Sequence, residues 1–256
     1  MTGMNAMYKK DFSALKKPSC LVGANAQAID AAHSTGAALL EAAYHGDEAV
    51  IERLLALGAD VHFSAAGFGR TALHVAAGEN HAGACQRLVA AGADLNARDR
   101  EGSTALFYAV TRGCTNAAAT LLAMGADLRA SGNEALLHDA AYKGDAALCK
   151  LLVNAGAELD RVDEGGQTAL HRAAAFGRAQ ACQALIAAGA CTDARVKGND
   201  RYAGKTAPEL AALMGHAALA GQIRAMASSR KAARALEDML REAIAPGMRR
   251  QLAGSP

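Results

Sequence analysis

The sequence contains no tryptophan, and only 4% of its residues are aromatic. Hydrophobic residues make up 52% of the chain, and alanine supplies the largest share of them. Small apolar side chains suit closely packed helices, because they let two helix backbones approach each other. The cores of β-sandwiches depend instead on β-branched and aromatic residues. The composition therefore argues against an all-β fold and predicts an all-α protein.

Long apolar segments are also missing. No run approaches the ~20 apolar residues of a membrane-spanning helix, and no apolar stretch follows a basic start in the manner of a signal peptide. The chain has six cysteines in 256 residues, and cysteines without a secretory signal favour a reducing compartment. We therefore expect a cytoplasmic protein without a membrane span.

The net charge of the chain is small, +2 overall. Residues 1–17 carry +3 and residues 224–256 carry +4, which leaves −5 for the segment between them. A nucleic-acid-binding protein concentrates Lys and Arg on its folded surface. An acidic body with short basic ends does not favour nucleic acid as the partner, and binding through the basic termini is kept only as an alternative.

Three sequence markers recur in one common phase. The first is Gly-Ala-Asp, which begins at residues 58, 92 and 125, with variants that begin at residues 156 and 189. The second is the Thr-Ala-Leu segment that begins at residues 71, 104 and 168. The third is a pair of small residues, namely Ala42-Ala43, Ala76-Ala77, Ala109-Val110, Ala140-Ala141, Ala173-Ala174 and Ala211-Ala212. Self-similarity at a fixed spacing of about 33 residues predicts an array of stacked repeats.

One period can be interpreted physically. Its Thr can cap the first free N–H groups of a short helix, and the small pair lets that helix pack closely on its neighbours. After a turn, a second helix carries apolar residues at helical spacing, such as Ile51, Leu54 and Leu55. A glycine such as Gly58 then supplies a left-handed residue at the helix end. A polar stretch such as residues 96–102 links to the next unit as a hairpin-like turn.

These markers resemble the ankyrin-repeat family over roughly residues 36–224. The match is carried by Asp163-x-x-Gly166-x-Thr168-Ala169-Leu170-His171 and by the Gly-Ala-Asp ends. Alanine replaces the family's usual proline after Thr in several units. The first unit lacks both Thr and His, and the fourth, Glu134–His138, is one residue out of step. The resemblance implies a solenoid of about six helix-turn-helix repeats with hairpin-like loops, of a bacterial kind.

The connection between the fifth and sixth units is longer than the others. Its extra residues lie in 195–204, which is rich in Lys, Arg, Gly and Asn and contains Tyr202. Such insertions usually fall on one face of a repeat array, often the binding face. The loop is therefore either part of a binding site or a solvated insertion that binds nothing.

The two ends of the chain are expected to differ from the repeats. Residues 1–20 look flexible, and residues 21–35 are expected to form a helix that closes the first repeat. An amphipathic helix is expected over residues 229–245 within the C-terminal segment 225–256, with Pro246-Gly247 as its stop signal. We expect this helix to cap the sixth repeat. The alternatives are a partner helix, a dimer contact and a membrane-surface helix.

Histidine and cysteine could in principle bind metal. His74, His138 and His171 share one repeat position, and the resemblance implies a structural role in which they bridge backbone groups between units. Cysteine occurs at a second-helix position that other units fill with Ile51 or Ala118, so Cys85, Cys149 and Cys182 are expected to act as small core residues. His81 and Cys85 lie one helical turn apart, but no second pair completes a zinc site. We expect no metal and no cofactor.

Motifs of catalysis are absent from the sequence. There is no Gly-x-Ser-x-Gly, no phosphate-binding Gly-x-x-x-x-Gly-Lys, and no His-Glu-x-x-His. The carboxylates fall mostly in turns and repeat ends. No segment outside the repeats is long enough for a catalytic domain. The sequence therefore predicts a protein that is not an enzyme and has no small-molecule substrate.

The resemblance implies a binding face built from the positions after each small pair, the hairpin tips, and the residue before each small pair. Aromatic residues and arginine are common anchors of protein interfaces, and six of the ten Tyr and Phe residues fall on this face. Phe63 is one of the six, but it could simply fold back on its loop, and the last repeat offers Leu213 and Met214. The predicted partner-binding residues are Tyr44, His45, Phe68, Glu79, Arg100, Tyr108, Arg112, Tyr142, Lys143, Arg172 and Phe176.

These observations lead to one functional prediction. The chain is predicted to be a protein–protein interaction module, an adaptor or an inhibitor, with a protein partner of unknown identity. The resemblance also allows a bacterial immunity or antitoxin-like inhibitor and a host-directed effector as alternatives. We expect a monomer, with a dimer through the C-terminal helix as the alternative.

Overall fold

The computed structural model describes the backbone at residues 24–130, 135–197 and 201–252, and the side chains from residue 35 to residue 240 within these ranges. The predicted flexible segment 1–20 lies outside them. The described residues form α-helices and no β-strand, so the predicted all-α fold is confirmed. The helices are α2 (Ala24–His45), α3 (Glu48–Ala56), α4 (Ala72–Gly78), α5 (Ala82–Ala90), α6 (Ala105–Arg112), α7 (Thr115–Ala123), α8 (Leu136–Lys143), α9 (Ala146–Asn154), α10 (Ala169–Ala175), α11 (Ala179–Ala188), α12 (Ala207–Leu213) and α13 (Ala217–Leu252).

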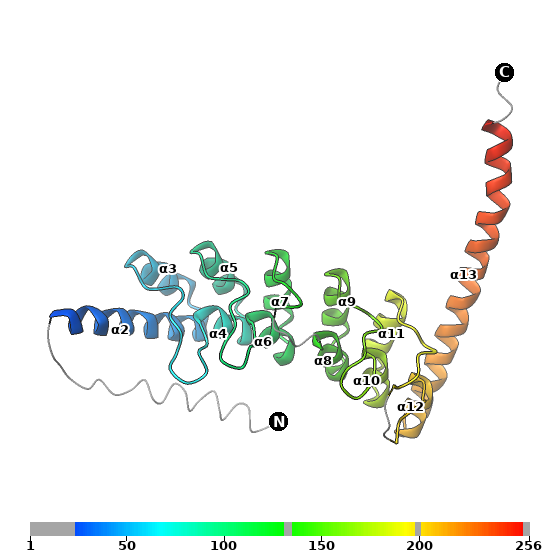
Figure 1. The fold of residues 1–256 in the computed structure, drawn as a ribbon, viewed down its shortest axis with the longest axis horizontal. Coiled ribbons are helices and arrows are strands. Elements are labelled where there is room, and N and C mark those ends of the chain that lie inside the picture. The colour runs from blue at the N-terminus through cyan, green and yellow to red at the C-terminus, as the bar shows by residue number, and fades with distance from the viewer. Residues whose placement is uncertain (1–23, 131–134, 198–200, 253–256) are drawn as a thin grey trace. The chain divides into compact units, whose positions relative to one another are not determined.

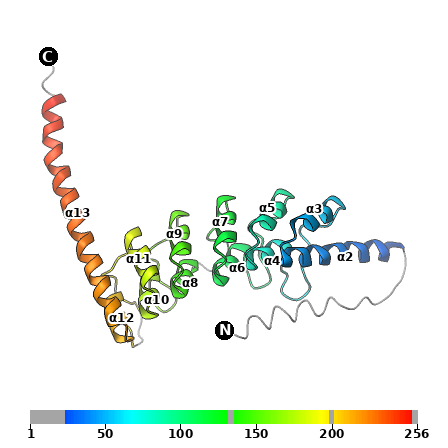
Figure 2. The same ribbon diagram turned by 180° about the vertical axis from the view of Figure 1, so that it is seen from behind.

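The chain divides into two compact units, residues 1–136 and residues 137–256, which we call the N-terminal unit and the C-terminal unit. In the N-terminal unit the first helices α2, α4 and α6 form one row, and the second helices α3, α5 and α7 form another (Figure 1). The view from behind shows the same two rows (Figure 2). In the C-terminal unit, α10 packs against α12, and α11 packs against both α9 and α13.

The predicted threonines lie at the starts of first helices. Thr104 Oγ1 accepts a hydrogen bond from the Phe107 amide at 3.3 Å, and Thr71 and Thr168 each form a capping box with the histidine three residues later. Second helices use aspartate in the same way, since Asp145 Oδ1 accepts from the Leu148 amide at 2.9 Å. Each cap satisfies amide groups that the helix itself cannot pair.

The core lies between the two rows of helices. The small pairs are buried: Ala76 and Ala77 are 0% exposed, as are Ala173 and Ala174. Large side chains fill the remaining space, and those with less than 2% exposure include one or more from most helices: Leu39, Ile51, Leu73, Leu88, Leu106, Leu121, Leu148, Leu152, Leu170, Leu185, Leu210 and Ile223. Burying one such side chain contributes about 1.5–3 kcal/mol, so stability is distributed along the array.

The helix expected at residues 21–35 does not end before the first repeat. It is instead the start of α2, which continues without a break to His45. Gly36 lies inside this helix, and the ring of Phe63 packs directly over it, so that a Cβ atom there would overlap the ring. The absence of a side chain at residue 36 therefore lets the first hairpin pack on α2, and Phe63 contacts this helix.

The C-terminal helix differs from the prediction in two ways. It is continuous with the second helix of the sixth repeat, and it runs through Pro246-Gly247 to Leu252. Leu219 and Ile223 are buried, whereas every side chain from residue 231 to residue 240 is exposed. This segment therefore does not cap the sixth repeat.

The exposed segment of α13 carries apolar side chains. Leu236, Met239 and Leu240 are 58%, 66% and 52% exposed. The helix is tied to the repeats just before this point, where Arg230 donates to the carbonyl of Ile186 and Lys231 Nζ lies 2.7 Å from Asp193 Oδ2. The dimer contact through this helix stays a prediction.

Candidate partner-binding surface

The residue that follows each small pair lies at the end of a first helix. Ala140 and Ala141 are buried in α8, and the next residue, Tyr142, is 39% exposed. In the next repeat Ala175 is buried as well, and Phe176, the C-cap of α10, is 46% exposed. The buried small residues hold α8 and α10 against their neighbours, and the aromatic residue after them lies at the surface.

Tyr142 and Phe176 contact each other at this surface. Their ring centroids are 4.5 Å apart and their planes are inclined by 82°, an edge-to-face arrangement. Such pairs are favourable beyond the area that they bury. The two rings remain about two-fifths exposed after pairing, so they form an exposed aromatic pair.

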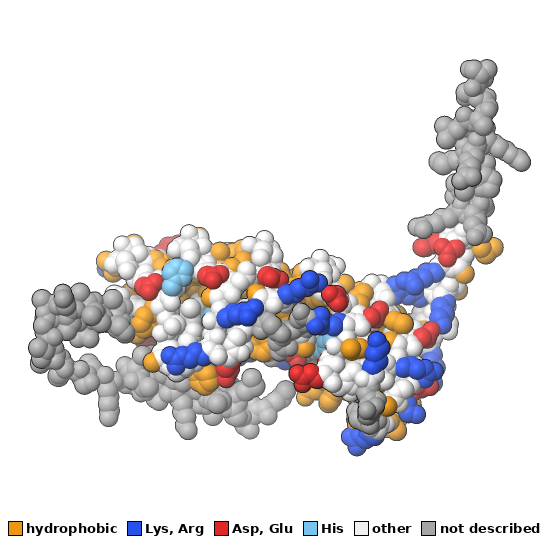
Figure 3. Space-filling view, in the orientation of Figure 1, with side chains coloured by type: hydrophobic (Ala, Val, Ile, Leu, Met, Phe, Trp, Pro, Cys, Tyr) orange, Lys and Arg blue, Asp and Glu red, His pale blue; other side chains and the backbone are white. Residues whose placement is uncertain are grey.

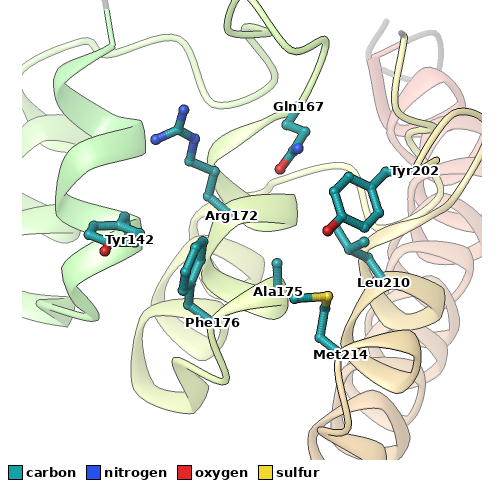
Figure 4. A pocket seen from close by; sticks show the side chains of 8 residues that line it. All are labelled: Tyr142, Gln167, Arg172, Ala175, Phe176, Tyr202, Leu210 and Met214. Atoms are coloured by element: carbon teal, nitrogen blue, oxygen red, sulfur yellow. The ribbon is translucent and has the colours of Figure 1, made fainter. Parts of the chain in front are cut away.

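A pocket of about 270 Å³ lies beside the aromatic pair in the C-terminal unit. Figure 4 shows Phe176 and Arg172 on one side of it and Tyr202 and Leu210 on the other, with Ala175 and Met214 between them. The full lining is Tyr142, Gln167, Arg172, Ala175, Phe176, Tyr202, Leu210 and Met214. The predicted residues Tyr142, Arg172 and Phe176 are therefore brought together around one cavity.

Arg172 is fixed at the edge of this pocket. Its Nε donates to Asp163 Oδ2 at 2.8 Å. Burial acts to raise the pKa of Asp163, but hydrogen bonds from the Gln167 amide and from Arg172 outweigh it, and the pKa is lowered. Asp139 on α8 has a raised pKa because it is buried, and the positive charge of Arg172 only partly offsets this effect.

The pocket includes residues that the sequence did not place in a binding site. Met214 follows a small pair and belongs to the predicted face, although it was not among the predicted anchors. Tyr202 ends the long connection, which was the one signal that pointed to it. Nothing distinguished Leu210, because it occupies an ordinary core position and is 1% exposed.

Tyr108 is 5% exposed, so the expectation that its side chain faces an open surface is wrong. Its hydroxyl donates to Asp99 Oδ2 at 2.6 Å and accepts from Arg70 Nε at 2.9 Å. The Arg70 guanidinium lies 4.6 Å from the centre of the Tyr108 ring and 4.5 Å from that of Phe68. Tyr108 and the half-buried Phe68 therefore hold two neighbouring hairpins of the N-terminal unit together.

Several other predicted residues of the N-terminal unit contact one another or the backbone. Arg112 Nη1 donates to Glu79 Oε1 at 2.5 Å and to the carbonyl of Gly78 at 2.9 Å. Arg100 Nη1 donates to the carbonyl of Gly67 at 2.7 Å. These contacts link consecutive repeats, so the side chains of Arg100, Arg112 and Glu79 help to hold the repeats together.

The remaining predicted residues lie at the ends of first helices. Tyr44 is half-buried and forms an edge-to-face contact with the exposed His45, with ring centroids 5.2 Å apart. Lys143 is half-buried at the end of α8. Tyr44 and Lys143 are thus less exposed than the aromatic pair of Tyr142 and Phe176, which lies in the C-terminal unit.

The repeated histidines bridge consecutive repeats, as predicted. His74 Nε2 lies 3.1 Å from the carbonyl oxygen of Ser103, and His171 Nε2 lies 3.2 Å from that of Lys205. His138 Nε2 is within 3.1 Å of two carbonyl oxygens, those of Arg161 and Gln167. Each ring joins a first helix to the following hairpin, so the histidines are structural.

The second-helix cysteines are core residues, as predicted. Cys85, Cys149 and Cys182 are each 0% exposed. Burial raises the pKa of each thiol to about 12, and a thiol in this state is a poor nucleophile. Within the described ranges, no group of three or more His, Cys, Asp or Glu side chains is arranged to hold a metal ion.

The fourth repeat leaves one histidine atom without a partner. In the second and fifth repeats the Thr hydroxyl lies 2.9 Å and 2.8 Å from Nδ1 of the histidine. Ala135 occupies this position before His138, whose buried Nδ1 has no hydrogen-bond partner among the described residues. We expect Ala135→Thr to raise the free energy of unfolding by about 1 kcal/mol, because it restores the helix cap and pairs this nitrogen. Urea denaturation of Ala135→Thr and the reciprocal Thr168→Ala tests this, and a destabilised Ala135→Thr would contradict it.

The buried histidines predict a stability that depends on pH. Burial lowers the pKa of His74, His138 and His171 in the folded protein, whereas unfolded histidine titrates near pH ~6.5. Below that pH the unfolded chain takes up protons that the folded chain does not, so stability is lost as pH falls. Denaturation at neutral pH and at pH ~5.5 should show this loss, and His171→Gln should reduce it. Stability that rises on acidification would contradict the prediction.

None of the described helices is both long enough and apolar enough to cross a membrane.

Paired helices joined by hairpin-like loops, with histidine bridges between repeats, define a helical repeat protein. A family profile described as ankyrin repeats (3 copies) matches residues 39–131, and one described as ankyrin repeats (many copies) matches residues 137–186. The chain belongs to the ankyrin-repeat family. Members of this family are typically non-catalytic, and no catalytic family was found.

Solved structures show the same fold. An ankyrin repeat domain from Acinetobacter baumannii AYE is 28% identical, with a TM-score of 0.63, and the match covers 74% of this chain and 97% of that one. The ankyrin repeat protein EF0377 gives the same identity, coverage and TM-score. The human ASB11 ankyrin repeat domain is 22% identical, with a TM-score of 0.59 over 72% of this chain and 96% of that one. No curated protein matches the sequence.

Proposed function

We propose that this chain is a non-enzymatic module that binds a partner protein against the first-helix surface of its C-terminal unit, as an adaptor or an inhibitor. The observation that carries the proposal is the exposed pair of Tyr142 and Phe176 beside a pocket. Ankyrin repeats are generally protein–protein interaction modules. Aromatic residues next to an arginine are frequent sites of high binding energy in such interfaces.

The N-terminal unit offers fewer exposed anchors. Tyr108 is buried, Phe68 and Tyr44 are half-buried, and Arg112 is paired with Glu79. The C-terminal unit leaves two aromatic rings and Met214 exposed near the ends of its first helices. The cytoplasm remains the compartment that we propose, since no disulfide joins the cysteines in the described part of the chain.

The proposal is tested by capturing partners from a lysate of the cells that make this protein, and then measuring the affinity of the captured partner. We expect the double variant Tyr142→Ala, Phe176→Ala to raise the Kd by roughly 30-fold or more, since losing a strong anchor costs about 2 kcal/mol. Leu57→Ala is the matched control, because Leu57 is 71% exposed and lies in the other unit. Equal affinity of the double variant and the wild-type protein would contradict the proposal.

The same complex separates an adaptor from an inhibitor. An inhibitor lowers the activity of its partner at saturating concentration, and the double variant then needs a correspondingly higher concentration. An adaptor leaves that activity unchanged. A bacterial immunity-like role is the inhibitor case, and a host-directed effector role requires that the partner comes from another cell.

A further inference from the structure

We propose that the pocket between α10 and α12 receives one apolar side chain of the partner, from a segment that carries Asp or Glu beside that side chain. This inference rests on the proposed function and specifies its partner. It follows from the size of the pocket, its apolar lining, and the charge of the hairpin that forms one of its walls.

The size of the pocket suits a side chain. Its volume of about 270 Å³ is below the ~300–1,000 Å³ usual for small-molecule sites. Ala175 leaves the space open, Leu210 and Met214 supply apolar atoms, and the rings of Phe176 and Tyr202 form opposite walls (Figure 4). An apolar anchor that enters this space contacts apolar atoms of the pocket and loses part of its exposure to water, as interface anchors do.

The wall formed by Tyr202 belongs to the hairpin between the fifth and sixth repeats, whose described residues 195–197 and 201–205 are held by backbone hydrogen bonds. The amide of Val196 donates to the carbonyl of Lys205 at 3.0 Å, and the amide of Lys197 donates to the carbonyl of Gly166 at 2.9 Å. The carbonyl of Lys205 also meets His171 Nε2 at 3.2 Å. The pocket is therefore preorganised, which lowers the entropy lost when a partner binds.

This hairpin is basic. Residues 195–205 hold the basic residues Arg195, Lys197, Arg201 and Lys205 against one acidic residue, Asp200. The four basic residues are exposed, and Arg195 Nη1 lies 3.9 Å from Glu209 Oε2. Arg201 lies 4.7 Å from the centre of the Tyr202 ring, so this cation is next to the pocket wall. Lys and Arg side chains gather over the C-terminal part of the molecule in the space-filling view (Figure 3). A partner segment with carboxylates would be attracted and oriented by this charge.

The opposite wall adds a second cation. The Nε of Arg172 is paired with Asp163, and none of the described residues accepts from its terminal nitrogens. A partner carboxylate could share this guanidinium with Asp163. Asp163 and Glu209 already pair with Arg172 and Arg195, so few positive charges are left for a ligand. One or two carboxylates beside an apolar residue fit these charges better than the continuous negative charge of a nucleic acid backbone, and we therefore favour an acidic peptide segment.

The experiment uses the intact protein and a random library of displayed peptides of about a dozen residues. We expect selection to enrich peptides with a large apolar residue flanked by Asp or Glu. Synthetic versions of the enriched peptides are then titrated against variants. Met214→Ser should weaken binding by at least about tenfold. Leu213→Ser is the matched control, since Leu213 is the adjacent exposed residue and does not line the pocket.

Charge is tested by a second matched pair. Arg201→Glu should weaken binding of the enriched peptide several-fold and reduce its dependence on salt. Lys150→Glu makes the same change on the exposed side of α9 and should have little effect. A labelled single-stranded oligonucleotide is included as a competing ligand, and tighter binding of it at the same residues would overturn the inference.

The other outcomes are also decisive. Enriched peptides without acidic residues, or equal effects of Met214→Ser and Leu213→Ser, would overturn the inference and leave the proposed function standing. So would a failure to enrich any peptide while partner capture still depends on Tyr142 and Phe176. Loss of that dependence as well would overturn both.

Discussion

Replacing Gly166 with alanine is expected to lower the free energy of unfolding by at least about 3 kcal/mol. Gly166 has a φ of +70°, a left-handed conformation that disfavours other residues. A Cβ atom there would overlap the carbonyl of Lys197 and lie 2.9 Å from its Cα. The alanine therefore pushes the two hairpins apart and breaks the hydrogen bond from the Lys197 amide to Gly166.

The control for this prediction is Gly156→Ala in the same unit. Gly156 has a φ of +95°, but a Cβ atom there meets nothing within 4 Å. Only backbone strain of about 1–2 kcal/mol is then expected. Urea denaturation measures both losses, and equal losses would show that hairpin contact at Gly166 contributes nothing.

Asp99→Ala is expected to destabilise the protein by about 3–5 kcal/mol, because it removes the acceptor of a buried network. Asp99 is 7% exposed. Its Oδ2 accepts from the Tyr108 hydroxyl at 2.6 Å and lies 3.7 Å from Arg70 Nε. Its Oδ1 accepts from the amides of Glu101 and Ser103, both at 2.9 Å. The variant leaves these donors and the charge of Arg70 without this carboxylate.

Two controls separate the network from a general effect of losing a carboxylate. Asp94→Ala removes an exposed aspartate that accepts from the Asn96 amide at 2.9 Å, and should cost about 1 kcal/mol or less. Tyr108→Phe removes one hydroxyl and should cost about 1 kcal/mol. Denaturation midpoints for Asp99→Ala that match those of Asp94→Ala would contradict the assignment of Tyr108 and Asp99 to a structural network.

The sequence was sufficient to predict the helical repeat because its markers describe local requirements. A repeat needs a cap at the start of its first helix, which Thr supplies. It also needs close packing in the middle of that helix, which the small pair allows, and a left-handed residue at the end of the second helix, which Gly supplies. The role of the histidines came from the family resemblance, and the structure confirms it in His74, His138 and His171.

The orientation of individual face residues could not be predicted in the same way. Tyr108 has a position equivalent to that of Arg172, but Tyr108 is 5% exposed and Arg172 is half-buried. The difference depends on which neighbours fill each space, here Arg70 and Phe68 of the preceding hairpin. The sequence pattern of a single repeat does not predict such contacts between repeats.

The pocket was missed for a related reason. It requires Ala175 in one repeat, Leu210 in the next and Tyr202 from the longer hairpin. Ala175 and Leu210 occupy ordinary positions in their repeats, and the long connection indicates Tyr202 but not where its ring lies. Only the packing of consecutive units places the three around one space. Pro246-Gly247 predicts the end of the C-terminal helix, whereas α13 continues to Leu252.

The central claim is tested most directly by hydrogen–deuterium exchange of the intact protein with and without its captured partner. Our account predicts slower exchange of the complex in α8, in α10 and in residues 201–215, with α9 and α11 little changed. Protection confined to α9 and α11, or to the N-terminal unit, would contradict the claim that the partner binds the first-helix surface of the C-terminal unit.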